Sequence, residues 1–118
     1  MKILLDHCVD RRLKRSMRAH HVVTTRDAGW QDFSNGLLLL QAATRFDLFL
    51  TTDKHIRHQQ NLSKLPLPVI ELNGVSNRLK SLQELLPFLE DAIQKTSSCK
   101  LVAIFPDGRI ECLGGRIP

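Results

Sequence analysis

The sequence predicts a single α/β domain in which a mainly parallel sheet is covered by helices on both faces. Three observations point to this class. Short apolar runs suited to buried strands alternate with helical patterns, the connections between them are short, and the last part of the chain has the pattern of a β-hairpin. The 118 residues fit one domain, and 42% hydrophobic with 25% charged residues is an ordinary globular composition.

The first half of the chain supplies three strands and two helices of this fold. Residues 2–6 are a compact apolar run, typical of a strand buried on both faces. Residues 9–19 carry apolar side chains at a spacing of four among many basic ones, which predicts an amphipathic helix with a basic outer face. A second strand is expected at "HHVVTT", a helix over 35–46 with Ser34 as its cap, and a third strand over 48–50.

The second half of the chain adds one strand, a helical segment and the hairpin. The stretch "LPVIELN" predicts the fourth strand. A helical segment covers 77–95, and Pro87 either kinks it or begins a second helix. After "TSS", two β-rich runs surround the turn "PDG", and this hairpin either extends the sheet antiparallel at one edge or mediates self-association. We therefore expect a domain over 1–95 with a hairpin extension of the same domain over 96–118.

The charge of the chain is basic and unevenly placed. The net charge is +5, and ten of the seventeen Lys and Arg residues and all five His lie in residues 1–60, together with six acids. Such a concentration of positive charge favours a polyanionic partner such as nucleic acid. The alternative is that the basic surface serves only to keep the protein soluble.

Cysteine usage and hydropathy indicate a cytoplasmic protein. Cys8, Cys99 and Cys112 are odd in number and lack a CxxC spacing, so neither a disulfide framework nor a zinc ribbon is indicated, and we expect reduced thiols. The beginning of the sequence lacks the ~7–15 consecutive apolar residues of a signal sequence. No segment approaches the ~20 apolar residues of a membrane span.

Three acids follow predicted strands: Asp6 the first, Asp27 the second and Asp53 the third. Ligands of open parallel sheets bind beyond the carboxyl ends of the strands. If carboxylates converge there, they repel each other unless a cation or a proton lies between them. Mg²⁺ or Mn²⁺ accepts one or two carboxylates, and it could activate water against a phosphodiester. The alternative is that these aspartates cap the helices or turns that follow them.

Several segments together resemble a known family. They are, in order, "MKILLD", "RRLKR", "VVTTRDAGW", "NGLLLLQAA", "FDLFLTTDKH", "HQQNL" and "PVIELNGVSNRLKSL". Their number, order and spacing over roughly residues 1–95 are similar to the uncharacterised PIN-like family, small bacterial proteins related to PIN-domain ribonucleases and often encoded in toxin/antitoxin-type pairs. The resemblance implies a compact three-layer α/β/α domain whose acidic residues bind Mg²⁺ or Mn²⁺ and hydrolyse RNA.

The resemblance carries over to only part of the acidic site. Asp6 matches the acid that ends the first strand, and Asp53 matches the acid of the "T-x-D" turn. Close relatives usually have an acid where this chain has His7, and another where it has Leu37. Because a leucine cannot bind a cation, the metal site is expected to be depleted. The nearby oxygen groups that could substitute are Asp27 and Asn35.

Three functions remain open at this stage. The first is a metal-dependent ribonuclease, the toxin-like member of a toxin/antitoxin pair, in which Asp6 and Asp53 hold the ion. The side chains expected to engage RNA phosphates are Arg11, Arg12, Arg15, Lys54 and Arg57. The second is a catalytically inactive module that binds RNA or a protein partner, and a phosphoacceptor signalling domain is a weaker third. The expected partners are RNA, an antitoxin-like protein and a second copy of the chain.

Overall fold

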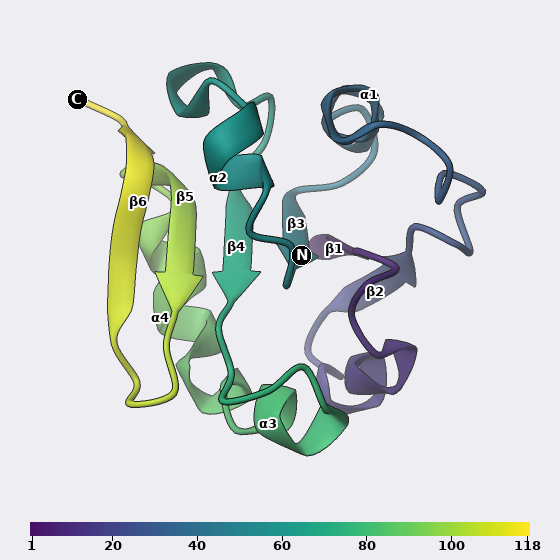
Figure 1. Ribbon diagram of the computed structural model, residues 1–118, viewed down its shortest axis with the longest axis vertical. Coiled ribbons are helices and arrows are strands. Elements are labelled where there is room, and N and C mark those ends of the chain that lie inside the picture. The colour runs from purple at the N-terminus through teal and green to yellow at the C-terminus, as the bar shows by residue number, and fades with distance from the viewer.

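A computed structural model of residues 1–118 contains one six-stranded sheet in the order β2-β1-β3-β4-β5-β6 (Figure 1). The strands are β1 (Lys2–Leu5), β2 (His21–Thr24), β3 (Leu48–Thr51), β4 (Val69–Leu72), β5 (Cys99–Ile104) and β6 (Ile110–Arg116). Strands β1 to β5 pair in parallel, and β6 pairs antiparallel with β5. The predicted α/β class and the mainly parallel sheet are confirmed, and the hairpin does extend the sheet at one edge.

The helical segments are shorter than the sequence predicts. The α-helices are α1 (Asn35–Ala42), α2 (Ile56–Gln59), α3 (Leu79–Gln83) and α4 (Leu89–Lys95), and the 3₁₀-helices are η1 (Arg11–Ser16), η2 (Leu62–Lys64) and η3 (Leu86–Phe88). The helix expected over 9–19 is only the six-residue η1. Pro87 lies in η3, where its missing N–H separates α3 from α4. None of the helices has the length and apolarity that crossing a bilayer requires.

Side chains of the strands alternate between two apolar clusters, one on each side of the sheet. Ile3 and Leu5 belong to the cluster that also holds buried residues of η1, α3 and α4. Leu4 and Phe49 belong to the cluster that holds buried residues of α1 and α2. Figure 1 accordingly places α2 in front of the sheet and α4 behind it.

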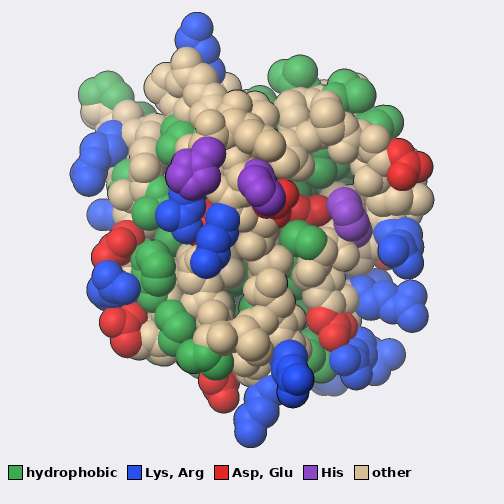
Figure 2. Space-filling model, viewed as in Figure 1, with side chains coloured by type: hydrophobic (Ala, Val, Ile, Leu, Met, Phe, Trp, Pro, Cys, Tyr) green, Lys and Arg blue, Asp and Glu red, His purple; other side chains and the backbone are tan.

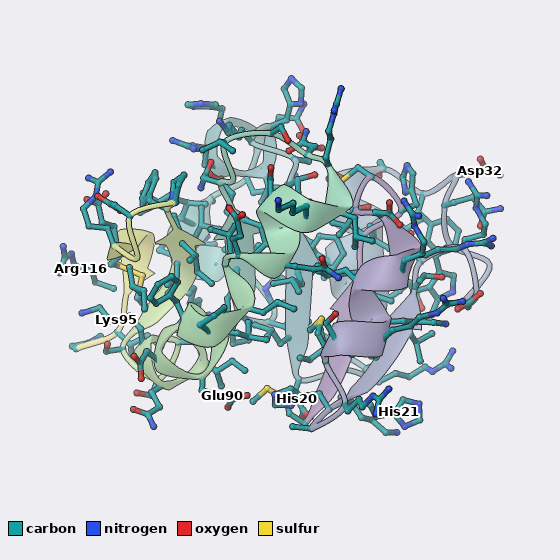
Figure 3. All side chains as sticks on the ribbon, turned by 90° about the horizontal axis from the view of Figure 1, so that it is seen from below. His20, His21, Asp32, Glu90, Lys95 and Arg116 are labelled. Carbon is teal, nitrogen blue, oxygen red and sulfur yellow. A yellow bond between two sulfur atoms is a disulfide. The ribbon has the colours of Figure 1, made fainter.

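A polar contact ties the turn before β2 to α4. The Nε2 atom of His20 lies 2.6 Å from a carboxylate oxygen of Glu90, although the two residues are 70 positions apart. Figure 3 shows the pair on the side of the molecule where η1 and α4 lie. The side chain of His20 is largely buried and that of Glu90 is exposed, so the contact lies at the surface of the protein.

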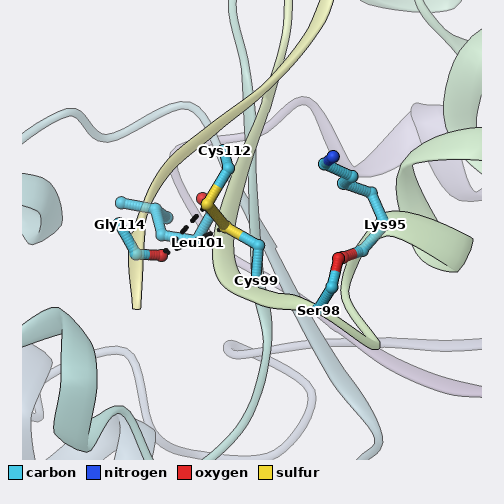
Figure 4. Close-up of a disulfide and its surroundings, with 6 residues drawn as sticks. All are labelled: Lys95, Ser98, Cys99, Leu101, Cys112 and Gly114. Atoms are coloured by element: carbon cyan, nitrogen blue, oxygen red, sulfur yellow. Dashed lines mark hydrogen bonds between the residues drawn. A yellow bond between two sulfur atoms is a disulfide. The ribbon is translucent and has the colours of Figure 1, made fainter. Parts of the chain in front are cut away.

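The expectation of three reduced cysteines was wrong. Cys99 in β5 and Cys112 in β6 form a disulfide between the two strands of the hairpin, with their Cα atoms 5.8 Å apart (Figure 4). Cys8 is the free cysteine. Spacing motifs could not reveal the bond, because it depends on the antiparallel pairing of β5 with β6 and not on a CxxC sequence.

The disulfide makes a direct prediction about the thiols and the stability of the protein. When the chain is unfolded without reductant, one thiol should react with a thiol-specific chromogenic reagent. When it is unfolded after reduction, three thiols should react. Reduction should lower the free energy of unfolding by about 3 kcal/mol, the effect expected for closing a loop of about this length. In a Cys8→Ser control, no thiol should react before reduction. Three reactive thiols in the unreduced intact chain would contradict the disulfide.

Candidate active site

Four buried polar side chains stand side by side at the carboxyl ends of the parallel strands. We call them the polar row: Thr25, Asp6, Thr51 and Glu71, whose exposed fractions are 0%, 3%, 0% and 1%. Each of the four lies two positions after a strand residue that packs in the cluster of α1 and α2. Because side chains alternate between the two faces of a sheet, all four side chains point toward these helices. Strand register places Thr51 directly beside Glu71.

A single hydroxyl group connects the two acids that the sequence singled out. Thr51 Oγ1 donates a hydrogen bond of 2.7 Å to Asp6 Oδ2. The same oxygen accepts a hydrogen bond of 2.9 Å from the backbone N–H of Asp53. Although 47 positions separate them in the sequence, Asp6 and Asp53 therefore lie at the same edge of the sheet.

Asp6 has a second polar neighbour, the imidazole of His7. His7 Nδ1 lies 3.2 Å from Asp6 Oδ1 and 3.3 Å from the hydroxyl oxygen of Thr25. The imidazole is about half exposed, whereas the carboxylate is buried. The half-exposed imidazole of His7 thus lies against the buried carboxylate of Asp6.

Asp53 is more accessible and is held by donors from two elements. One of its oxygens accepts hydrogen bonds from the backbone N–H of His55 (2.8 Å) and lies 2.7 Å from the ring nitrogen Nδ1 of that residue. The other accepts from Asn35, the first residue of α1, at 3.5 Å. Partial burial disfavours the charged form, but these donors outweigh it and hold the pKa of Asp53 below its ordinary value.

Asp27 and Leu37, the other positions considered for the acidic site, are both exposed. Asp27 lies 3.5 Å from Lys14 Nζ, and a hydrogen bond with Thr24 together with the nearby lysine lowers its pKa. Leu37 is an exposed apolar side chain on α1. No group of three or more His, Cys, Asp and Glu side chains is placed to hold a metal ion. Oxygen ligands available next to each other at this edge include the Asp6 carboxylate and the Thr51 hydroxyl, with Asp53 two positions further along the chain.

Glu71 is a buried acid that the sequence reasoning missed. Arg57 of α2 donates to both of its oxygens, through Nε at 3.2 Å to one and through Nη2 to the other. Asn73 Nδ2 donates a third bond at 3.0 Å. Arg57, expected to engage RNA phosphates, is therefore committed to a carboxylate inside the protein. The signal in the sequence was an acid within the apolar strand "VIELN".

The other expected RNA-binding side chains lie on the surface. Arg11 and Arg15 of η1 and Lys54 are exposed and form no ion pair, whereas Arg12 donates to both oxygens of Asp10. Figure 2 shows Lys and Arg side chains gathered at the lower right, the region of η1 and β2 in Figure 1. His side chains lie across the middle of the same view, next to acidic atoms.

Cys8 does not provide an activated nucleophile at this edge. Its sulfur lies 3.2 Å from the hydroxyl of Thr52 and 3.6 Å from that of Thr51. Burial of the thiol and the nearby charge of Asp6 raise its pKa. At neutral pH the group therefore stays protonated, and the protonated thiol is the unreactive form.

Comparisons with known proteins do not identify a family for this chain. No family model matches it, and neither the curated proteins nor the solved structures contain a significant match. The likeness to the PIN-like family thus stays an expectation from the sequence. The function has to be inferred from the residues at the carboxyl edge of the sheet.

Proposed function

We propose that the protein is a PIN-like, metal-dependent ribonuclease with a partly depleted acidic site. The observation that carries the proposal is the Thr51 hydroxyl, which bonds both to the Asp6 carboxylate and to the backbone N–H of Asp53, so that the two acids lie at one edge of a parallel sheet. This edge is where ligands of open parallel sheets bind. The packing of helical segments on two clusters also suits the three-layer arrangement of a PIN-like domain.

The donor chemistry at this edge fits a hard divalent cation. The carboxylates of Asp6 and Asp53 would hold Mg²⁺ or Mn²⁺, and the amide N–H of Asn35 helps to position Asp53. Such ions need only one or two protein carboxylates, since water and phosphate oxygens complete their shell. When bound, the ion would supply activation of water and stabilisation of charge on the phosphodiester.

The protein's own residues would prepare the site and position the RNA. Thr51 orients Asp6, while His55 and Asn35 orient Asp53, so both carboxylates are held in place before a ligand arrives. The unpaired cations of η1 would bind RNA phosphates and contribute an affinity that falls with salt. The biological setting we infer is the toxin-like member of a pair with an antitoxin-like protein.

A second candidate is a module that binds RNA or a protein partner without turnover. Each carboxylate of the site already has partners within the chain, and no group of three ligating side chains is present to hold an ion. Leu37 further removes a position that is usually acidic in the family. A protein of this kind would keep the basic surface, and its RNA affinity would fall steeply with salt.

Titration calorimetry with Mn²⁺ tests the metal site. The intact protein should bind the ion, and Asp53→Asn should abolish the heat because it removes one of two charged ligands. Asp32→Asn is the matched control, since Asp32 is an exposed acid with no ion pair and lies at the periphery of the molecule (Figure 3). Absence of heat with the intact protein would reject the metal-dependent reading. RNA binding without cleavage in Mn²⁺ would then favour the second candidate.

A further inference from the structure

A polar pocket opens beside the proposed catalytic edge, between the loop that follows β1 and the loop that follows β2. Its volume is about 340 Å³, and only two of its nine lining residues are hydrophobic. The residues that matter here are His7, Asp10, Arg11, Arg26, Asp27 and Asn77, and we call the site the Arg11–Arg26 pocket. Its size lies in the range of small-molecule sites, and its lining suits a charged ligand.

The acids of this pocket are neutralised by cations, whereas two of its arginines are not paired. Arg12 donates to Asp10 through Nε at 3.1 Å and Nη2 at 2.8 Å, and Lys14 lies 3.5 Å from Asp27. Arg11 and Arg26 make neither an ion pair nor a side-chain hydrogen bond in the structure. The charge left for a ligand in the Arg11–Arg26 pocket is therefore positive.

The pocket is continuous with both the catalytic edge and the basic surface. His7 lines it and also contacts Asp6, so the pocket adjoins the proposed metal ligand. A second hollow, of about 230 Å³, shares Arg11 and Asp27 with it. The remaining residues of that hollow are Arg12, Lys14 and Arg15. If a nucleotide occupied the Arg11–Arg26 pocket, the phosphate groups on its 5′ and 3′ sides would therefore lie next to polar or basic side chains.

We propose that the Arg11–Arg26 pocket binds the phosphate monoester of a nucleotide, either free or at the 5′ end of an RNA strand. A guanidinium group presents planar, forked donors that match phosphate oxygens, and two unpaired arginines match a group that carries nearly two negative charges. A phosphodiester inside a strand carries only one. The inference rests on the proposed RNA-processing function, and it adds that the protein recognises a terminal phosphate monoester beside the catalytic edge.

Binding of adenosine 5′-monophosphate, compared with adenosine, tests the pocket. By calorimetry the monophosphate should bind and the nucleoside should not. Arg26→Gln should weaken binding about tenfold or more, since a hydrogen bond to a charged group contributes roughly 1.5–3 kcal/mol. Arg18→Gln is the matched control, because Arg18 is exposed and unpaired but does not line the pocket. Equal binding of adenosine, or equal effects of the two substitutions, would overturn the proposal.

Oligonucleotides distinguish the two sources of the monoester. A short RNA with a 5′-phosphate that binds more tightly than its 5′-hydroxyl counterpart identifies the RNA end, and equal affinities together with binding of the mononucleotide identify a free nucleotide. The inference and the proposed function can fail separately. Mn²⁺-dependent cleavage by a protein that binds neither adenosine 5′-monophosphate nor a 5′-phosphorylated RNA more tightly than the unphosphorylated compound would reject the pocket alone, whereas phosphate binding by a protein that neither binds Mn²⁺ nor cuts RNA would reject the nuclease alone.

Discussion

Replacement of Arg57 by methionine should lower the free energy of unfolding by about 3 kcal/mol or more. The substitution leaves the carboxylate of Glu71, only 1% exposed, with Asn73 as its remaining side-chain donor. Removing one partner of a buried ion pair typically costs about 3–5 kcal/mol, because the other charge stays buried without compensation. Arg57 is itself about one quarter exposed, so we expect the lower end of that range. Urea denaturation followed by circular dichroism measures the effect.

Two further variants separate the ion pair from simple loss of a side chain. Adding Glu71→Gln to Arg57→Met removes the stranded charge and should restore part of the lost stability. Lys54→Met provides the matched control, since Lys54 is exposed and has no partner, and its effect should stay within about 0.5 kcal/mol. If Arg57→Met changed the free energy of unfolding by no more than about 0.5 kcal/mol, the burial of the Glu71 carboxylate would not depend on its ion pair with Arg57.

The second large effect concerns catalysis and depends on the proposed function. Asp6→Asn should lower the rate of Mn²⁺-dependent RNA cleavage by about 10³-fold, because a metal site supplies several kcal/mol of charge stabilisation and each 1.36 kcal/mol is about a factor of ten. Asparagine retains an oxygen that can accept the hydrogen bond from Thr51, so the fold should persist. A labelled RNA oligonucleotide and a denaturing gel give the rate.

The role of the bridging hydroxyl can be tested in the same assay. Thr51→Val keeps the shape of the side chain but removes the bond to Asp6 and the acceptor for the backbone of Asp53. We expect it to lower the cleavage rate about 10- to 100-fold, the range found for groups that orient metal ligands. Asp32→Asn should cleave like the intact protein. Cleavage by Asp6→Asn at the intact rate would remove Asp6 from the reaction.

Much of the fold could be predicted from the sequence, because a buried segment has a local pattern of apolar residues. The apolar runs of β1, β3 and β4 and the "PDG" turn identified the parallel strands and the hairpin. Pro87 was expected to interrupt the helical segment 77–95, and it lies between α3 and α4. Helix lengths were less predictable. The basic pattern over 9–19 looked like an α-helix, yet the chain forms only η1 there, with Leu13 as its buried residue.

The site was only partly predictable, for a different reason. Asp6 and Asp53 stood out because each follows an apolar strand, but Thr51, which connects them, looked like an ordinary strand residue. Glu71 and its partner Arg57 are 14 positions apart, and no local pattern pairs them. The disulfide of the hairpin was missed in the same way, since its cysteines meet only when β5 and β6 pair.

By itself the sequence determined which segments are buried, which of them are strands, and that acidic side chains end several of those strands. These properties depend on neighbouring residues, through the alternation and the apolar content of each segment. Only the tertiary structure decided that Thr25, Asp6, Thr51 and Glu71 form one polar row and that the exposed Asp27 pairs with Lys14. Contacts of this kind depend on strand order and register, which arise when distant segments pack together and not within any one of them.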